Sequence, residues 1–359
     1  MRGSGYVRSG REAILHLLDH EHAAVWPEIE AKIADQLYLP LRVRVDPHHL
    51  STAKQELLED GEIVATVHQA RGGRDIRILH LPETTGRKRL LSRAAGRKRL
   101  LQARFLGWAV TNRLVGPAGE RVLHASLIGV SPERGYRMEN ASATGVPVLL
   151  GDSIPAGPLD NTAHLPITDA RGVTQRTVTL PIEVKNVRDW IYPENYRLHQ
   201  LLYKASVLQQ AHRDVPIVPV LVCRRAHITT YWMASVFGFY VAAAKAQFVL
   251  RTAEVPERLL NEVRDELGYD LEYEDSGSRL LRHHFAKALP GAASELADKW
   301  AELGSSYADF YQELRDPGLD LRLRGQLKKD LSLAVMEARS PAWEVPAETE
   351  DFESPYDEF

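Results

Sequence analysis

The stretch TLPIEVKNVRDW, residues 179–190, decides the fold of the central region of this 359-residue chain. With the residues just before it, the run is rich in Val, Thr and Ile, which predicts a β-strand. Side chains two positions apart lie on the same side of a strand, so Glu183 and Lys185 project together, while Ile182 and Val184 point into the core. Taken alone, the pair is also compatible with an exposed ion pair worth under ~1 kcal/mol.

A second carboxylate gives the pair a possible chemistry. Asp160 lies in GPLDNTAHLPI, 23 positions before Glu183, and the chain between them is long enough for a turn and a returning strand. Two carboxylates at neighbouring strand ends can hold Mg²⁺, which prefers oxygen ligands and leaves places for water and phosphate. A metal held there polarises a phosphoryl oxygen, and Lys185 is suited to orient water or stabilise the developing charge.

The elements around this strand are predicted from their patterns. Residues 100–115 favour a helix, and a stretch rich in Gly, Pro and Ser then leads to residue 146. After the strand, residues 193–212 predict an amphipathic helix, and the continuous apolar run at 215–226 predicts a buried strand. Residues 237–250 favour another strand, with a helix as the alternative.

Pro158-x-Asp160 followed by Glu183-x-Lys185 resembles the PD-(D/E)xK nuclease superfamily, which includes type II restriction endonucleases, archaeal Holliday junction resolvases and RecB-like nucleases. The element order over residues 100–250 is also similar to that family. The resemblance implies that Asp160 and Glu183 are ligands of Mg²⁺ or Mn²⁺ and that Lys185 is the catalytic lysine.

The resemblance also implies two supporting groups. The backbone carbonyl of Val184 would be a third metal ligand, and Gln200, on the following helix, would support the site as in RecB-like members. Lys204 stands where those members usually have Tyr. Asp152 is a competing first acid, and Asp160 is preferred because its spacing to Glu183 is typical of the family.

One feature departs from the family pattern. Many members carry an acid on the first core helix, but residues 97–113 contain none. The nearest later acid, Glu120, follows Gly116, Pro117 and Gly119 and is predicted to lie outside that helix.

Residues 9–81 predict three helices and a hairpin. Ser9 is a candidate cap for the first helix, residues 25–37 form the second, and the third runs from an Asp46 cap to a stop at Gly61. Two β-rich runs then flank a Gly-Gly turn. This order resembles a winged helix-turn-helix domain, in which the third helix enters the major groove and the wing rests on the backbone.

The winged-helix resemblance implies a set of DNA-facing side chains, with the two arginines at the wing tip: Ser51, Thr52, Lys54, Gln55, Arg71 and Arg74. A winged helix used for protein contacts, or as a spacer, is the alternative.

Residues 84–104 repeat GRKRLL at 86–91 and 96–101 and contain no acid. The high density of Lys and Arg in this segment suits the neutralisation of phosphates. A solvated helical linker is the alternative. Residues 1–110 hold 18 Lys and Arg against 13 Asp and Glu, whereas the remainder holds 27 against 35. The front end is therefore expected to meet a polyanion. The basic residues of the repeat that are candidates for DNA contact are Arg87, Lys88, Arg89, Arg97, Lys98 and Arg99.

The bulk composition narrows the class of protein. The chain has one cysteine, which excludes an internal disulfide, and no apolar run reaches the ~18 residues of a membrane span. No signal-peptide core and no nucleotide-binding fingerprint is present, so a cytoplasmic protein without a nucleotide cofactor is expected. The tail at 344–359 carries seven acids and no basic residue, and it is expected to be disordered, as a solubilising tail or as a cover for the basic front end.

These observations predict an α/β (α+β) chain. We expect a winged helix at 1–83, a basic linker at 84–104, a restriction endonuclease-like αβββαβ core at 105–252, a helical region at 253–340 and an acidic tail at 341–359. The expected function is Mg²⁺-dependent DNA hydrolysis, in restriction, defence or DNA processing, with a homodimer and an RNA substrate as open possibilities. The alternative is a DNA-binding regulator or assembly factor whose nuclease-like core is inactive.

Overall fold

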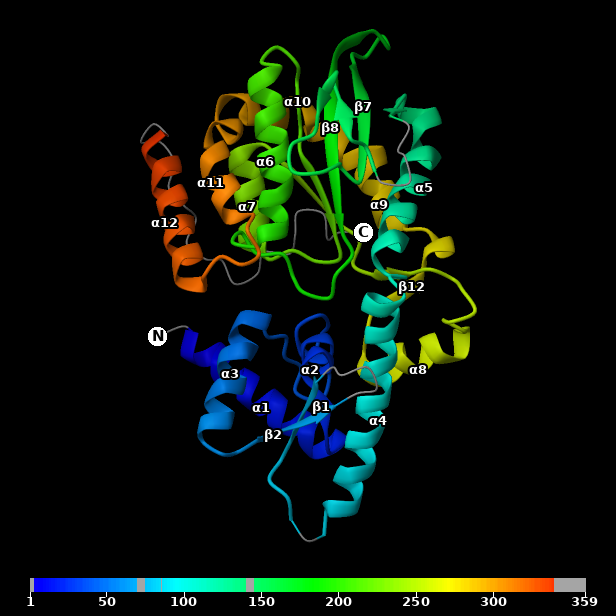
Figure 1. The fold of residues 1–359 in the computed structure, drawn as a ribbon, viewed down its shortest axis with the longest axis vertical. Helices are drawn as coiled ribbons and strands as arrows, with labels where there is room; N and C mark the ends of the chain where they lie inside the picture. The colour runs from blue at the N-terminus through cyan, green and yellow to red at the C-terminus, as the bar shows by residue number, and fades with distance from the viewer. Residues whose placement is uncertain (1–2, 70–74, 85, 140–144, 339–359) are drawn as a thin grey trace. The chain divides into compact units, whose positions relative to one another are not determined.

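The computed structural model describes residues 3–69, 75–84, 86–139 and 145–338 (Figure 1). The expected mixed α/β class is confirmed, with helices and strands alternating along the chain. The chain packs as two compact units. Unit 1 is Met1–Val115 with Val249–Tyr273, and unit 2 is Gly116–Phe248 with Glu274–Phe359.

Unit 1 begins with three helices, α1 (Gly3–Glu21), α2 (Trp26–Ile33) and α3 (Pro47–Glu59). The start of α3 follows the sequence: the Asp46 side chain accepts a hydrogen bond from the His48 amide, and Pro47 is the first helical residue. Gly61, at φ 70°, follows the helix, as a stop signal should. The third predicted helix is therefore confirmed.

The strands of unit 1 form a small antiparallel sheet in the order β1-β3-β2. β1 is Ala24–Val25, β2 is Val64–Gln69 and β3 is Asp75–His80. Ile78 of β3 lies between Val25 and Thr66 and is fully buried, so this sheet closes over the helices. Both strands of the predicted hairpin are confirmed.

Two more helices complete unit 1. α4 (Lys88–Leu106) continues into a π-helical turn at Gly107–Thr111, and α8 (Glu257–Leu267) packs beside α4. β12 is Leu271–Tyr273, and β11 (Gln247–Val249) spans the point where the chain returns from unit 2 to unit 1.

Unit 2 is built on a five-stranded sheet in the order β10-β9-β8-β7-β4. β7 and β8 are antiparallel, whereas β8, β9 and β10 run parallel to one another. The long strand predicted around Glu183 and Lys185 is confirmed as β8, which ends at Lys185 and leaves residues 186–190 outside the strand. The strand bounds are β4 (Arg137–Met138), β5 (Val148–Leu149), β6 (Asp152–Ser153), β7 (Asn161–Thr168), β8 (Thr174–Lys185), β9 (Val220–Cys223) and β10 (Tyr240–Ala243).

Helices cover both faces of this sheet. α5 (Gly116–Arg134) packs against β7 and β8, and α6 (Tyr196–Ala211) packs against β8 and β9 (Figure 1). The remaining helices of unit 2 are α7 (Ile228–Phe237), α9 (Arg279–His283), α10 (Leu289–Glu302), α11 (Ala308–Leu314) and α12 (Leu321–Ala338), with π-helical turns or 3₁₀ turns at His284–Ala288, Glu274–Ser276 and Gly304–Tyr307.

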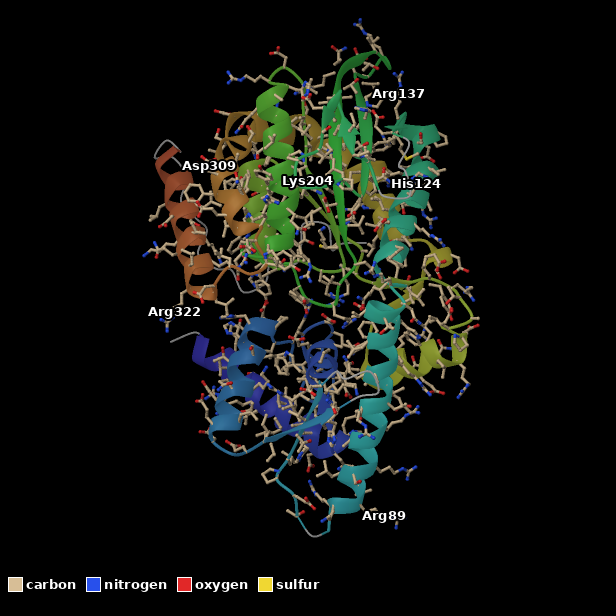
Figure 2. The ribbon with its side chains drawn as sticks, viewed as in Figure 1. Arg89, His124, Arg137, Lys204, Asp309 and Arg322 are labelled. Carbon is tan, nitrogen blue, oxygen red and sulfur yellow. The ribbon has the colours of Figure 1, made fainter. Side chains whose placement is uncertain are left out.

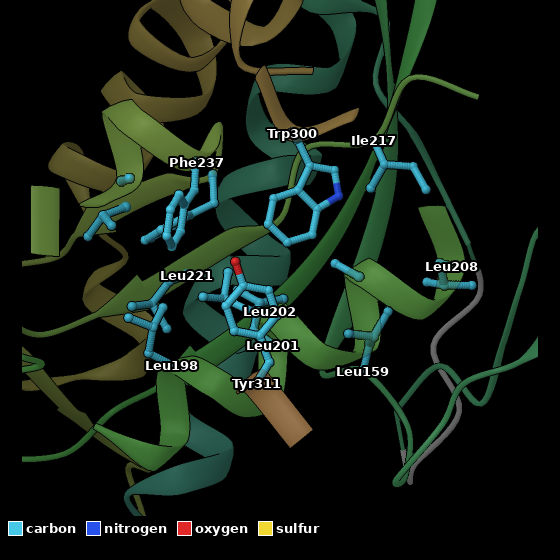
Figure 3. Packing of buried hydrophobic residues seen from close by; sticks show 14 of the residues in the cluster. Leu159, Leu198, Leu201, Leu202, Leu208, Ile217, Leu221, Phe237, Trp300 and Tyr311 are labelled. Carbon is cyan, nitrogen blue, oxygen red and sulfur yellow. The ribbon is translucent and has the colours of Figure 1, made fainter. Parts of the chain in front are cut away.

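The main core of unit 2 lies under α6. Leu198, Leu201 and Leu202 of α6 are fully buried against Leu221 of β9, and Trp300 closes the cluster (Figure 3). Cys223 of β9 is also buried, as its apolar strand predicts. This packing fixes α6 against β8 and β9 and so determines which α6 side chains reach the end of β8.

Two local predictions are wrong, and one helix was not predicted. Ser9 lies inside α1 rather than at its start, because that helix begins six residues earlier, at Gly3. The stretch after residue 115, read as loop-rich, forms the 19-residue helix α5, whose Val122, Leu123 and Leu127 are fully buried. No helix was predicted where α7 lies, and the strand predicted over residues 237–250 is divided into β10 and β11.

Some expectations fall outside the described residues. The wing tip with Arg71 and Arg74, and the acidic tail from residue 344, are among them. In the part of the chain that the structure describes, no helix combines the length and apolar character needed to cross a bilayer.

Candidate functional site

The register of β7 and β8 brings the two candidate acids together. Asn161 pairs with Ile182 in the antiparallel ladder. Extending this register by one residue sets Asp160 opposite Glu183, and such opposed residues have Cβ atoms ~5 Å apart. Glu183 and Lys185 in turn pair with Leu221 and Cys223 of β9. The candidate site therefore lies where β8 ends, between a strand on each side.

Glu183 is nearly fully buried, at 3% exposed, and it is held by two lysines. Its Oε2 accepts a hydrogen bond from Lys185 Nζ at 2.6 Å, and its Oε1 accepts one from Lys204 Nζ at 2.5 Å. Burial alone would raise the pKa of Glu183, but the positive charges of Lys185 and Lys204 hold it below its ordinary value. Glu183 is therefore an ionised carboxylate inside the protein.

Lys204 ties the two halves of the site together. It comes from α6, and its Nζ donates to the Pro158 carbonyl at 2.6 Å as well as to Glu183 (Figure 2). Lys204 was noted in the sequence as standing four residues after Gln200, but its contacts with Glu183 and Pro158 were not predicted. Gln200 is half-buried on the same helix, and within the described chain the structure gives it no hydrogen bond to Glu183 or Lys185.

Asp160 has the opposite electrostatic character. Burial and the negative charge of Glu183 raise the pKa of Asp160 to about 7, although Lys185 and a hydrogen bond from the Val184 amide lower it. The Val184 N–H donates to Asp160 Oδ2 at 2.6 Å. Val184 thus touches the carboxylate through its N–H, whereas the sequence predicted a role for its carbonyl.

A third carboxylate, Glu120, lies close enough to influence the site. It comes from α5, and burial raises its pKa while the charge of Lys185 lowers it and that of Glu183 raises it further. The expectation that residues 97–113 form the helix next to the sheet is therefore wrong, although that stretch does lack an acid. The helix against β7 and β8 is α5, not residues 97–113, which belong to unit 1.

Gly119 explains how α5 approaches β8 so closely. A Cβ at this position would lie 2.7 Å from Asn186 Cβ and 3.0 Å from Val184 Cγ1. The glycine was read as a loop signal, but it serves here as a close-approach residue within a helix. It brings the α5 backbone against β8 immediately before Glu120.

Neighbouring polar groups define the edge of the site. The Asn161 side-chain amide contacts His124 Nδ1 of α5 at 3.4 Å. His124 is exposed, and Figure 2 labels it on α5. Asp152, the competing first acid, instead pairs with His212 Nε2 at 2.8 Å. That contact leaves Asp160 as the acid beside Glu183.

The donor set limits what could bind. Within the residues that the structure describes, no three His, Cys, Asp or Glu side chains gather around a common point as metal ligands. The donors that fit a hard divalent cation are the carboxylates of Asp160 and Glu183. Burial and the charge of Glu183 raise the pKa of Asp160, so a cation bound beside both carboxylates would lower it again.

In unit 1, the predicted DNA-facing side chains of α3 are mostly accessible. Ser51, Thr52 and Gln55 are exposed, while Leu50, Ala53 and Leu57 form the buried face of the helix. Lys54 is half-buried with its Nζ 3.9 Å from the centre of the Trp26 ring, and burial lowers its pKa. The side chains of Ser51, Thr52 and Gln55 therefore lie on the exposed face of α3, outside the core.

The basic residues of α4 divide into three kinds. Arg89 and Arg99 are exposed. Arg87 and Lys88 are exposed but pair with acids, Arg87 with Asp19 and Lys88 with Glu83. Arg97 makes ion pairs with two acids of α8, Glu262 and Glu266.

Lys98 corrects the prediction of phosphate contact at that position. It is 4% exposed, and its Nζ donates to Glu21, to Glu28 and to the Glu266 carbonyl. Glu28 is itself fully buried, so the second GRKRLL copy is in part an internal ion-pair element. Lys98 is therefore not available for phosphate contact, and such contact stays a prediction for the exposed Arg89 and Arg99.

Comparison with known proteins gives no relative. No protein-family model matches the chain, and no curated protein and no solved structure matches it either.

Proposed function

We propose that the chain is a metal-dependent nuclease that hydrolyses DNA phosphodiester bonds at the end of β8. The observation that carries this proposal is the position of Asp160, one residue before β7, beside the end of β8, where its carboxylate accepts from the Val184 N–H. Glu183 of β8 lies next to it and is bonded to the Lys185 ammonium. An exposed ion pair would not be nearly fully buried, as Glu183 is. It would also not face a second carboxylate whose pKa is raised.

Each residue has a chemical task in this proposal. Asp160 and Glu183 hold a divalent cation, which, when bound, polarises the scissile phosphate and lowers the pKa of a bound water. Lys185 turns its ammonium from Glu183 towards the non-bridging oxygens and stabilises the charge that develops there. Lys204 keeps its bond to the Pro158 carbonyl and so holds the loop that carries Asp160 against the end of β8.

The order of elements supports the same family resemblance. Apart from the small separate hairpin of β5 and β6, the chain runs from α5 through β4, β7 and β8 to α6 and β9, as helix, three antiparallel strands, helix and parallel strand. Glu120 on α5 supplies the acid on the first helix that many PD-(D/E)xK nucleases carry. Asp160, Glu183 and Lys185 then fall at the motif positions of that superfamily.

Unit 1 is proposed to bind the DNA. The order α1, β1, α2, α3, β2, β3 resembles that of a winged helix, and Ser51, Thr52 and Gln55 are exposed on α3. Arg89 and Arg99 add exposed positive charge. Binding through phosphates predicts affinity that falls steeply as salt rises.

A cleavage assay tests the proposal. Supercoiled plasmid and single-stranded DNA are incubated with the full chain and Mg²⁺ or Mn²⁺, with RNA in a parallel lane. The wild type is expected to cut DNA, and Lys185→Ala is expected to lose at least ~100-fold in rate. Lys287→Ala, which removes an exposed lysine of unit 2, is the matched control and should cut normally. Equal cleavage by Lys185→Ala would end the assignment.

One observation favours a second candidate. Glu183 is already neutralised by two lysines, Lys185 and Lys204, which is also how a purely structural ion cluster would look. The chain would then be a DNA-binding regulator or assembly factor with an inactive core. DNA binding without cleavage under either metal is the result that would select it.

A further inference from the structure

The residue that follows Lys185 is fixed by its side chain as well as by its backbone. Asn186 is buried, at 8% exposed. Its Nδ2 donates to the Phe248 carbonyl at 2.8 Å, and its Oδ1 accepts from the Phe248 N–H at 3.0 Å. One side-chain amide therefore binds both backbone groups of a residue in β11, which is not a strand of the five-stranded sheet.

The backbone around Asn186 is held in two further places. The Val187 N–H donates to the Lys185 carbonyl at 2.9 Å, which closes a three-residue turn centred on Asn186. The Asn186 carbonyl accepts from Gln247 Nε2 at 3.1 Å. Because β8 ends at Lys185, these bonds determine how the chain leaves the strand at the residue next to the proposed catalytic lysine.

Asn186 also meets the helix that carries Glu120. A Cβ at Gly119 of α5 would lie 2.7 Å from Asn186 Cβ, so the α5 backbone rests against this side chain. Glu120 directly follows Gly119, and Lys185 directly precedes Asn186. Asn186 therefore lies next to the backbone of two site residues that come from different elements.

An amide at this position suits the task of fixing Lys185. It carries a donor and an acceptor side by side, so it can match the N–H and the carbonyl of a single residue. A lysine ammonium stands on a flexible four-carbon stem, and its aim depends on a fixed backbone. At an enzyme site, a misplacement of about 1 Å costs on the order of 100-fold in rate.

We propose that Asn186 is a positioning residue of the candidate active site, whose amide holds the Lys185 backbone where the ammonium can turn from Glu183 to the substrate. This inference rests on the proposed nuclease function. Asn186 binds neither the metal nor the phosphate in this account. Its loss should therefore slow the bound complex, whereas metal and DNA are still held by other residues.

Two variants of the full chain test the inference by plasmid cleavage in Mg²⁺. Asn186→Ala removes both bonds to Phe248, and kcat per folded chain is expected to fall at least ~10-fold. Gln247→Met removes only the bond to the Asn186 carbonyl, and a smaller fall of about threefold is expected. Gln247 Oε1 has no hydrogen-bond partner among the described residues, so this second variant leaves no new acceptor unpaired.

Two other readouts separate positioning from a general loss of structure. The KM for plasmid and the Mn²⁺ affinity, measured by electron paramagnetic resonance, should stay within about twofold of the wild type in both variants. Gln209→Ala is the matched control, because Gln209 is also a buried amide, and its Nε2 donates to the His212 and Val215 carbonyls. It should lose stability in urea as Asn186→Ala does and keep the wild-type kcat.

The outcomes separate this inference from the proposed function. A kcat within twofold of the wild type in folded Asn186→Ala, or in Gln247→Met if Asn186→Ala does not fold, would overturn the inference alone. An equal fall of kcat in Gln209→Ala, or a tenfold loss of Mn²⁺ affinity in Asn186→Ala, would do the same. A wild-type chain that cuts no DNA would instead refute the proposed function, and the inference with it.

Discussion

Replacing Asp160 by Asn should stabilise the metal-free protein at alkaline pH, even though Asp160 is proposed to bind the metal. Burial and the charge of Glu183 raise the pKa of Asp160 from its ordinary 3.8 to about 7 in the folded chain. Between these values the folded chain keeps a proton that the unfolded chain has lost. The free energy of unfolding therefore falls as pH rises through this window, and the loss is complete above pH 7.

The size of the effect follows from the two pKa values. Their difference corresponds to roughly 4 kcal/mol at ~1.36 kcal/mol per pH unit. Asp160 retains some contact with solvent, which weakens the cost of its charge, so we expect about half of that value, ~2 kcal/mol. Asn has nearly the same shape, and its carbonyl can still accept the hydrogen bond from the Val184 amide.

The assay is urea unfolding in EDTA at pH 4 and at pH 8, followed by circular dichroism. Asp160→Asn should exceed the wild type by about 2 kcal/mol at pH 8 and match it near pH 4. Asp214→Asn, at an exposed carboxylate of the same unit, is the control and should show no such gain. If Asp160→Asn is less stable at pH 8, or gains equally at both pH values, the electrostatic account of the site is refuted.

Three further substitutions test the packing around the site and the ion cluster of unit 1. Lys204→Met leaves the Pro158 carbonyl and one side of Glu183 unpaired, so we expect a loss of about 2 kcal/mol in urea unfolding, and an unchanged value would contradict the bridging role. Gly119→Ala should cost about 2 kcal/mol because its Cβ would lie 2.7 Å from Asn186 Cβ, whereas Gly129→Ala on the same helix, with 3.9 Å to its nearest atom, should be neutral. Lys98→Met leaves the buried Glu28 with Lys32 as its remaining lysine partner and should cost about 2 kcal/mol, while Arg99→Ala should change stability by less than ~0.5 kcal/mol; equal effects would reject the buried role of Lys98.

Local signals in the sequence predicted the elements whose form depends on their own residues. Asp46, Pro47 and Gly61 mark the ends of α3 because capping and φ preferences act within a few residues. The Val, Thr and Ile content of β8 predicted a strand for the same reason. The two-residue period of that strand also predicted that Glu183 and Lys185 share one side.

The sequence could not predict what depends on long-range packing. Gly119 reads as a turn residue locally, and only the approach of β8 shows that a helix needs it there. Glu120 was not predicted to belong to the site because α5 was read as a loop-rich stretch. In the structure, burial and the charges of Lys185 and Glu183 all shift the pKa of Glu120. Lys98 reads as a surface charge until Glu28, 70 residues earlier, is found beside it. Lys204 was noted in the sequence only as standing where the related family usually has Tyr. Its bond to the Pro158 carbonyl depends on how α6 packs against the sheet.

The most direct test of the central claim is a Mn²⁺ titration of the full chain followed by electron paramagnetic resonance. The proposal predicts one bound Mn²⁺ per chain, with binding weakened at least tenfold in Asp160→Asn and in Glu183→Gln and unchanged in the exposed control Asp214→Asn. Absence of bound Mn²⁺ at millimolar concentration, or equal binding by all four proteins, would contradict the claim that Asp160 and Glu183 hold a metal together.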